Sequence, residues 1–151
     1  EELPRRIERL EHDGCSGSLL YLDLDRLKVL NDRWGHETGD AAIRMVARLL
    51  REATRPTDLL ARLGGDEFVV WLDGADLFTA AERADLLCQS AGEQEVDTPE
   101  GPAPIGLSIG IAARPSGLFE DIDGLLHRAD QAMYIAKQEG RGRWHAAGLP
   151  Q

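Results

Sequence analysis

Apolar side chains recur along this chain at two periods, which together predict the order of its secondary-structure elements. Strand-length apolar runs cover residues 18–23, 58–63, 67–72 and 105–113. Apolar positions three and four residues apart predict helices from residue 26 to about residue 34, from residue 40 onward, and over residues 80–89 and 125–136. A short polar helix over residues 5–11 and a short edge strand within residues 140–146 complete the prediction.

Glycine-rich and polar segments separate these elements. Residues 14–17 end the first helix, residues 35–39 are expected to turn the chain before Asp40 opens the next helix, and residues 92–104 form a polar excursion. Gly64 and Gly65 lie between two strand patterns, which predicts a two-residue hairpin turn that tolerates positive φ at both positions. The resulting order, β-α-α-β-β-α-β-α-β, predicts an α+β fold with a ferredoxin-like core: a central, mostly antiparallel five-stranded sheet surrounded by helices.

Composition limits the classes of function. The chain has 151 residues and a hydrophobic fraction of 42%, which fits one globular domain. No apolar run approaches the ~20 residues that span a bilayer, so no membrane contact by this domain is expected, although the start at Glu1 fits a fragment of a larger, even membrane-anchored, signalling protein. A net charge of −10 argues against a nucleic-acid polymer as partner and leaves a small phosphorylated ligand open. Cys15 and Cys88 lack metal-ligand spacing and are expected to be unpaired thiols of a cytoplasmic protein.

Two acids, Asp66 and Glu67, follow the glycine pair at the tip of the predicted hairpin, where like charges repel. Hairpin chemistry alone explains the glycines but not the acids. Asp23 ends the first buried strand, so it can face Asp66 if that strand lies beside the hairpin. Carboxylates gathered in this way suit Mg²⁺, which keeps several waters and takes phosphate oxygens as further ligands. Asp25 is interpreted mainly as the N-cap of the following helix.

Asn31 and Asp40 are candidate readers of a nucleobase. Asn31 lies on the edge of an apolar helix face, where a buried amide needs hydrogen-bond partners. The partners of this amide are either other groups of the protein or the edge of a bound base. Asp40 fits a helix cap by position; if it meets Asn31, it can accept from the N1 and N2 donors of guanine, which adenine lacks.

Phosphate binding by an acidic chain requires locally placed cations and open backbone. Lys137 and Arg141 lie on one face of the last predicted helix. Their alternative explanation is a solvated C-terminal turn favoured by the helix dipole. Lys28 is a third candidate cation, and the missing side chains of Gly64 and Gly65 would let phosphates approach the backbone.

Four ordered blocks of the chain resemble GGDEF-domain diguanylate cyclases. Gly64-Gly65-Asp66-Glu67-Phe68 is the family signature, and residues 23–40, DLDRLKVLNDRWGHETGD, are similar to its DxDxFKxxND…GHxxGD stretch. Residues 107–112 (LSIGIA) and 129–143 (ADQAMYIAKQEGRGR) match two later blocks. The similarity runs from about Leu3 to Trp144 and covers nearly the whole chain.

The resemblance implies a nucleotidyl-cyclase fold and an enzyme that condenses two GTP to cyclic di-GMP and two pyrophosphates. It implies Mg²⁺ as cofactor, with Mn²⁺ as a substitute, and a homodimer, because each domain holds one GTP and the active site forms between two facing domains. The catalytic and metal-binding groups that it implies are Asp23, the Leu24 carbonyl, Asp66 and Glu67, with Glu67 assisting loss of the 3′-hydroxyl proton. The substrate-binding residues that it implies are Asn31, Asp40, His36, Lys28, Lys137, Arg141, Gly64, Gly65, and Arg26 and Leu27 through their N–H groups.

A second site is implied by Arg55-Pro56-Thr57-Asp58, which matches the RxxD motif where the family binds cyclic di-GMP as an inhibitor. Without the resemblance, Pro56 and Asp58 would be interpreted as a helix stop and a turn. Arginine pairs with guanine O6 and N7 and with phosphate, and Asp can accept from guanine N–H groups. Arg83 resembles a second arginine that bridges to the bound product.

The chain departs from the family pattern at three places. Leu27 replaces the usual Phe, which predicts a repacked core, and Gly142 replaces the usual Asn, which predicts a looser final turn. The family's LTGLPNR stretch survives only as ELPRR at residues 2–6. The alternative to an active cyclase is a non-catalytic GTP-sensing or cyclic di-GMP-sensing module that regulates a fused domain. A generic α+β domain without Mg²⁺-dependent nucleotide binding and a distant mononucleotide cyclase are the remaining alternatives.

Overall fold

The computed structural model describes residues 16–117 and 120–148, so the predicted helix over residues 5–11, the ELPRR segment and Cys15 lie outside the described residues. The helices are α2 (Leu27–Trp34), α3 (His36–Ala53), α4 (Leu77–Gly92) and α5 (Ile122–Gln138). The strands are β1 (Gly17–Leu24), β2 (Leu59–Gly64), β3 (Glu67–Asp73), β4 (Glu95–Thr98), β5 (Gly101–Pro104), β6 (Leu107–Arg114) and β7 (Trp144–Ala146).

A five-stranded sheet with the order β2-β3-β1-β6-β7 forms the centre of the fold. β1 pairs antiparallel with β3 on one side and with β6 on the other, β2 pairs antiparallel with β3, and the short strand β7 pairs parallel with β6. The predicted α+β fold with a mostly antiparallel sheet surrounded by helices is therefore confirmed. The prediction of a plain polar excursion over residues 92–104 is wrong: β4 and β5 form a separate hairpin there, in which Val96 and Ala103 pair and are buried.

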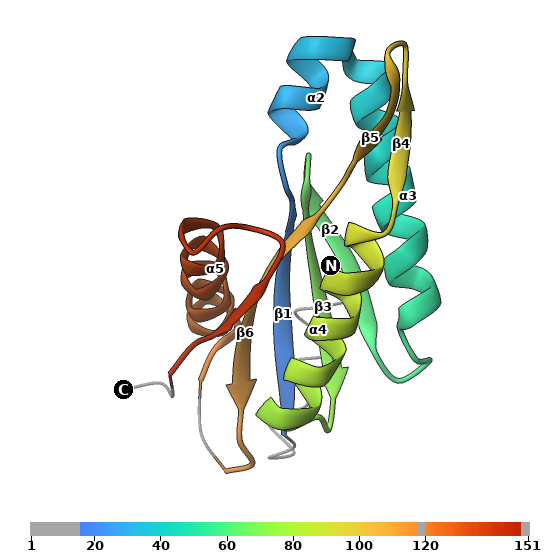
Figure 1. The fold of residues 1–151 in the computed structure, drawn as a ribbon. Coiled ribbons are helices and arrows are strands. Elements are labelled where there is room, and N and C mark those ends of the chain that lie inside the picture. The colour runs from blue at the N-terminus through green and yellow to red at the C-terminus, as the bar shows by residue number, and fades with distance from the viewer. Residues whose placement is uncertain (1–15, 118–119, 149–151) are drawn as a thin grey trace.

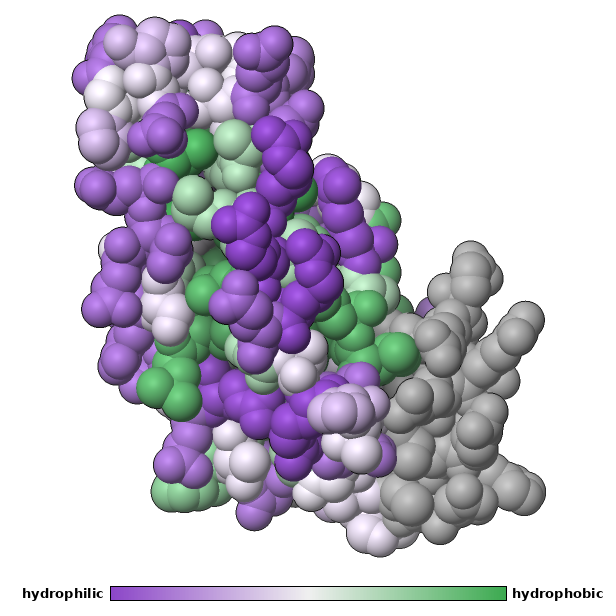
Figure 2. All heavy atoms as spheres, turned by 90° about the vertical axis from the view of Figure 1, so that its right-hand side faces the viewer, coloured by the Kyte–Doolittle hydropathy of each residue, from purple (hydrophilic) through white to green (hydrophobic). Residues whose placement is uncertain are grey.

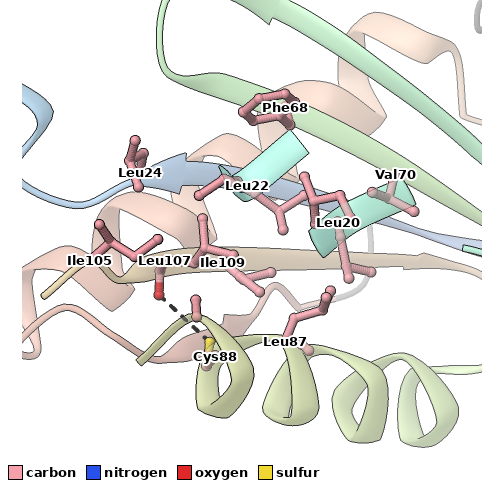
Figure 3. Close-up of a cluster of buried hydrophobic side chains, with 14 of the residues drawn as sticks. Leu20, Leu22, Leu24, Phe68, Val70, Leu87, Cys88, Ile105, Leu107 and Ile109 are labelled. Atoms are coloured by element: carbon pink, nitrogen blue, oxygen red, sulfur yellow. Dashed lines mark hydrogen bonds between the residues drawn. The ribbon is translucent and has the colours of Figure 1, made fainter. Parts of the chain in front are cut away.

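Helices cover both faces of the sheet, with α5 on one face and α4, with α3 beside it, on the other (Figure 1). Alternation along β1 explains this arrangement, because successive side chains of a strand point to opposite faces. Leu20 and Leu22 belong to the cluster that includes residues of α3 and α4 (Figure 3), whereas Leu19 and Tyr21 pack with α5. Leu27 joins the first cluster at 8% exposure, as expected for an apolar replacement.

Three local predictions are wrong, each because a long-range or backbone effect overrides local pattern. α3 begins at His36, not at Asp40, because Gly35 alone makes the bend with φ of 91° and residues 36–39 are already helical. Asp25 does not cap α2: Arg26 is the N-cap, with φ of 60° and no side-chain cap hydrogen bond. α5 ends at Gln138, so Arg141 does not continue its helical face.

One face of the molecule (Figure 2) is mostly polar, in line with the charge of the chain. Figure 2 shows one face on which hydrophilic side chains dominate, with smaller hydrophobic patches between them. Within the part of the chain that the structure describes, no helix has both the length and the apolar character needed to cross a membrane.

Candidate functional site

The ends of β1, β3 and β6 meet at one end of the sheet and bring the candidate acids together. Asp23 pairs in register with Glu67 of β3 on one side and with Ser108 of β6 on the other. Directly opposed residues of paired strands point to the same face, so the Asp23 and Glu67 side chains lie side by side. The N–H of Leu24 donates to the Asp66 carbonyl at 3.1 Å, which holds the hairpin turn against the end of β1.

Asp23 is the most constrained acid of this group, with only 5% of its surface exposed. Its Oδ2 accepts from Lys137 Nζ, while its buried Oδ1 has no hydrogen-bond partner among the described residues. Burial raises the pKa of the Asp23 carboxyl to about 7; the Lys137 ammonium opposes this rise, and the neighbouring Asp66 carboxyl adds to it. Asp23 and Asp66 therefore share one small space, where a divalent cation would offset their repulsion.

Glu67 lies beside this pair and contacts a tyrosine that the sequence pattern does not single out. Tyr21 Oη donates to Glu67 Oε1 at 3.2 Å. Burial and then the negative charge of Glu67 raise the pKa of Tyr21 well above its usual value. A pocket of about 580 Å³ opens between these acids and α5; its lining includes Asp23, Glu67, Asp130, Tyr134 and Lys137.

The donor set fits a hard divalent cation that is only partly ligated by protein. Within residues 16–117 and 120–148, no three His, Cys, Asp or Glu side chains gather around one metal position. The arrangement instead offers the adjacent carboxylates of Asp23 and Asp66, with an unpartnered buried oxygen on Asp23. Mg²⁺ commonly binds through one or two carboxylates and completes its shell with water and substrate phosphates.

The hairpin turn consists of Gly65 and Asp66, not of the two glycines. Gly64 still belongs to β2 and pairs with Glu67 after a register shift, and neither glycine has the positive φ that a Gly-Gly turn predicts. A Cβ on Gly64 or Gly65 would meet no atom within 4 Å, so open space lies over this backbone. Arg62 donates from Nε and Nη2 to the Gly65 carbonyl at 3.1 and 2.7 Å and holds the turn; its only sequence signal is its place before Gly64.

The candidate base readers lie where α2 and α3 pack against each other. Asn31 Oδ1 is buried and has no hydrogen-bond partner among the described residues. A Cβ on Gly39 would lie 1.7 Å from this oxygen, so α3 passes over the Asn31 amide only because residue 39 is glycine. Asp40 follows on the exposed side of α3 and lines a cleft of about 470 Å³. His36 and Lys28 are both exposed. Within the described residues, neither of them forms a hydrogen bond with Asn31.

Two arginines with left-handed backbone lie around a smaller pocket next to the acids. Arg26 has φ of 60° and Arg141 has φ of 61°, a conformation that non-glycine residues rarely adopt. Both line a pocket of about 210 Å³ together with Asp25. The absence of a side-chain cap at Arg26 leaves the first N–H groups of α2, beginning at Leu27, available to an anion.

A second cluster joins Arg55, Asp58 and Arg83. Arg55 donates to Asp58 from its backbone N–H at 2.9 Å and from Nη2 at 3.0 Å, and Arg83 Nη1 reaches Asp58 Oδ2 at 3.5 Å. Burial alone would raise the pKa of Asp58, but the hydrogen bonds from Arg55 and the nearby charge of Arg83 outweigh it and lower the pKa. Arg55 also donates to the carbonyl of Asp73, at the opposite end of β3 from Glu67 and therefore roughly 20 Å from the acids.

Comparison with known proteins gives consistent results. The family model described as "Diguanylate cyclase, GGDEF domain" matches residues 1–143. The chain is 34% identical over 146 residues to diguanylate cyclase DosC of Escherichia coli, covering 95% of this chain and 32% of the relative. It is 39% identical over 130 residues to diguanylate cyclase DgcM of the same species, covering 86% of this chain and 30% of the relative. The chain thus spans about a third of the length of these relatives.

Solved structures show the same architecture. The GGDEF domain of DgcB from Caulobacter crescentus, in complex with c-di-GMP, has 32% identity and a TM-score of 0.88, over 96% of this chain and 85% of that chain. The GGDEF domain of TpbB (YfiN) from Pseudomonas aeruginosa has 37% identity and a TM-score of 0.87, over 98% of this chain and 86% of that chain.

Proposed function

The chain belongs to the GGDEF-domain family of diguanylate cyclases, and from this premise we propose that it condenses two GTP molecules to cyclic di-GMP and two pyrophosphates. The observation that carries the proposal is the buried Asp23 carboxylate, which shares its space with Asp66 and has an oxygen without a partner among the described residues. A buried carboxylate oxygen without a hydrogen-bond partner is costly unless a ligand satisfies it. A metal-bound nucleotide supplies that ligand.

The metal site in this proposal has the adjacent carboxylates of Asp23 and Asp66 at its centre, with the carbonyl of Leu24 beside them and Glu67 as the remaining acid. These oxygens would hold Mg²⁺, or Mn²⁺ in its place, which when bound makes a ribose hydroxyl more acidic and spreads charge from the attacked phosphate. Glu67 receives the 3′-hydroxyl proton in this assignment. Tyr21 donates to one oxygen of Glu67, Oε1, and so limits the orientations of the carboxylate.

Phosphate binding falls to cations and open backbone around the acids. Lys137 now pairs with Asp23, and its side chain remains 26% exposed. A divalent cation on Asp23 would take over that charge pairing, so the ammonium could turn to a phosphate oxygen. Arg141, Lys28 and the N–H groups of Arg26 and Leu27 supply further positive charge and donors, and the uncovered backbone of Gly64 and Gly65 lets the phosphates approach.

Guanine recognition is assigned to Asn31 and Asp40, with exposed His36 at the rim. The unpartnered Oδ1 of Asn31 can accept from a base N–H, and the Asp40 carboxylate can accept from N1 and N2 of guanine. Adenine lacks both of those donors, so this pair would favour GTP over ATP. Discrimination between GTP and ATP would come mainly from polar groups of the site that stay buried without a partner when the wrong base is bound.

One domain provides one such site, whereas the reaction joins two nucleotides head to tail. We therefore propose a homodimer in which two copies face each other across their nucleotides, so that each 3′-hydroxyl meets the α-phosphate held by the partner. The Arg55, Asp58 and Arg83 cluster is assigned to the product as an inhibitor. Its two guanidinium groups suit guanine O6 and N7 and phosphate.

The test is turnover by a chain fused to a dimerising coiled coil. With GTP and Mg²⁺, cyclic di-GMP is expected in chromatography, and it should disappear on chelation of the metal. The matched control is Glu67→Gln, which keeps the size of the side chain and should bind a non-hydrolysable GTP analogue without turnover. A fused wild-type dimer that binds the analogue but forms no cyclic di-GMP would refute the proposal and support the sensing-module alternative.

A further inference from the structure

Asp25 is a buried carboxylate with both oxygens in use, although the sequence predicts it as a helix cap. Its Oδ1 accepts from Ser108 Oγ at 2.6 Å, and its Oδ2 accepts from the N–H of Gly142 at 2.9 Å. Its own N–H donates to the carbonyl of Gly106 at 2.9 Å. A Cβ on Gly106 would come within 3.1 Å of Oδ2, so the space around this carboxylate is also restricted. Asp25 therefore ties the end of β1 both to β6 and to the turn after α5.

The turn that Asp25 reaches has an unfavourable backbone. Gly140, Arg141 and Gly142 have φ of 128°, 61° and 62°, all on the left-handed side. For Arg141, which carries a side chain, this conformation is disfavoured, so contacts elsewhere must hold it. One contact is the N–H of Arg141 to the Ala136 carbonyl at 3.1 Å, which belongs to the end of α5. The bond from Gly142 to Asp25 is the contact that ties this turn to the strand end carrying the acids.

We propose that Asp25 is a positioning residue for Arg141. By accepting from Gly142, it fixes the turn that places Arg141 at the pocket that Arg26 and Asp25 also line. The inference rests on the proposed function, in which Arg141 contacts the nucleotide phosphates. Asp25 itself touches neither metal nor nucleotide, and its effect passes through the backbone of one neighbouring residue.

If Asp25 acts through its hydrogen bonds, two substitutions at this position should have different effects. Asp25→Ala removes both acceptor oxygens and should loosen the turn. Asp25→Asn keeps one oxygen for the Gly142 N–H, and its amide can donate to Ser108, whose hydroxyl can also accept. The asparagine should therefore restore most of what the alanine loses, whereas a residue that acted as a metal ligand would lose its function in both variants.

The first measurement follows the turn without any ligand. Amide hydrogen exchange of residues 140–143 should become about tenfold faster in Asp25→Ala and stay close to wild type in Asp25→Asn. Ser18→Ala is the matched control, because Ser18 is a buried polar residue of β1 whose hydroxyl makes one hydrogen bond, to the Ala75 carbonyl at 2.9 Å. If Asp25→Ala does not fold, Asp25→Ser is the milder truncation. Unchanged exchange in the folded truncation overturns the proposal, whether or not the chain binds GTP.

The second measurement is a double-mutant cycle on affinity for a non-hydrolysable GTP analogue with Mg²⁺. Asp25→Ala should weaken binding about tenfold in the wild-type background and much less in an Arg141→Ala background. Equal losses in both backgrounds, or an Asp25→Asn variant as weak as Asp25→Ala, overturn the positioning role. A wild-type chain that binds no analogue counts against the proposed function instead, and the exchange experiment still decides the contact.

Discussion

Replacing Asp23 by asparagine should stabilise the metal-free protein at neutral and alkaline pH while abolishing its response to Mg²⁺. Asp23 is 5% exposed, and burial raises the pKa of its carboxyl to about 7 from an ordinary value of 3.8, against the opposing effect of Lys137. The folded protein thus keeps the proton on Asp23 up to about pH 7, whereas the unfolded chain loses it near pH 4. Without a bound metal ion, ionisation of Asp23 therefore lowers the stability of the fold even though Lys137 pairs with it.

The sign and size of the effect follow from proton linkage. Between about pH 4 and about pH 7 the folded state binds more protons than the unfolded state, so the contribution of Asp23 to the free energy of unfolding falls as pH rises. This contribution is fully present below about pH 4 and fully lost above about pH 7. A pKa displaced from 3.8 to about 7 corresponds to roughly 4 kcal/mol, because each pKa unit corresponds to about 1.4 kcal/mol. Asp23→Asn has no proton to lose, so its advantage over wild type should grow by up to this amount.

The assay is urea denaturation of both proteins in chelator, followed by circular dichroism at several pH values. Asp32→Asn, at an exposed position of α2, controls for the loss of one negative charge. Saturating Mg²⁺ should then raise the midpoint of wild type and leave Asp23→Asn unchanged, since only the carboxylate gains from the cation. A stability difference between Asp23→Asn and wild type that does not vary from about pH 4 to about pH 8 would show that the buried carboxyl is not desolvated as described.

Three further outcomes are expected. Gly39→Ala should weaken guanine-nucleotide binding by roughly ten- to a hundredfold in calorimetry, because its Cβ would lie 1.7 Å from Asn31 Oδ1 and displace the amide; unchanged affinity would mean that Asn31 does not contact the base. Gly142→Asn should be tolerated within about 0.5 kcal/mol of the free energy of unfolding, because asparagine adopts the left-handed conformation that φ of 62° requires, whereas a similarly small loss for Gly142→Val would contradict this explanation. Arg55→Ala should abolish inhibition by added cyclic di-GMP without lowering the initial rate, because Arg55 pairs with Asp58 far from the acids; inhibition that persists in the variant would place the product elsewhere.

Local pattern predicts most of the fold because the strands of this chain are continuous apolar runs and its helices have clear apolar faces. It fails at residues 36–39, where glycine and threonine suggest a turn although the segment is helical. Gly39 is glycine for a tertiary reason, the contact with Asn31, which no local rule encodes. The β4–β5 hairpin is missed for a similar reason: its three prolines and its charges resemble a loop, and its stability comes from burial of Val96 and Ala103.

The candidate site, like the fold, could be predicted from the sequence only in part. Acids that end a strand and begin its hairpin neighbour can be predicted to converge, and the register of Asp23 against Glu67 shows that the strand ends meet. The interactions of Asp25 could not be predicted, because its two side-chain partners lie 83 and 117 residues further along the chain. Tyr21 is a similar case, because its hydroxyl reaches Glu67 only after β1 and β3 have paired.

The central place of β1 has a consequence for how the polypeptide is made. Its two neighbours in the sheet, β3 and β6, begin about 40 and about 80 residues after β1 ends. Long loops must therefore close before the middle of the sheet is complete. In a nascent chain that pauses on the ribosome before β6 is made, one edge of β1 stays unpaired. Such an edge can pair with a wrong strand or bind a chaperone. Translation must run past Arg114 before that edge is closed.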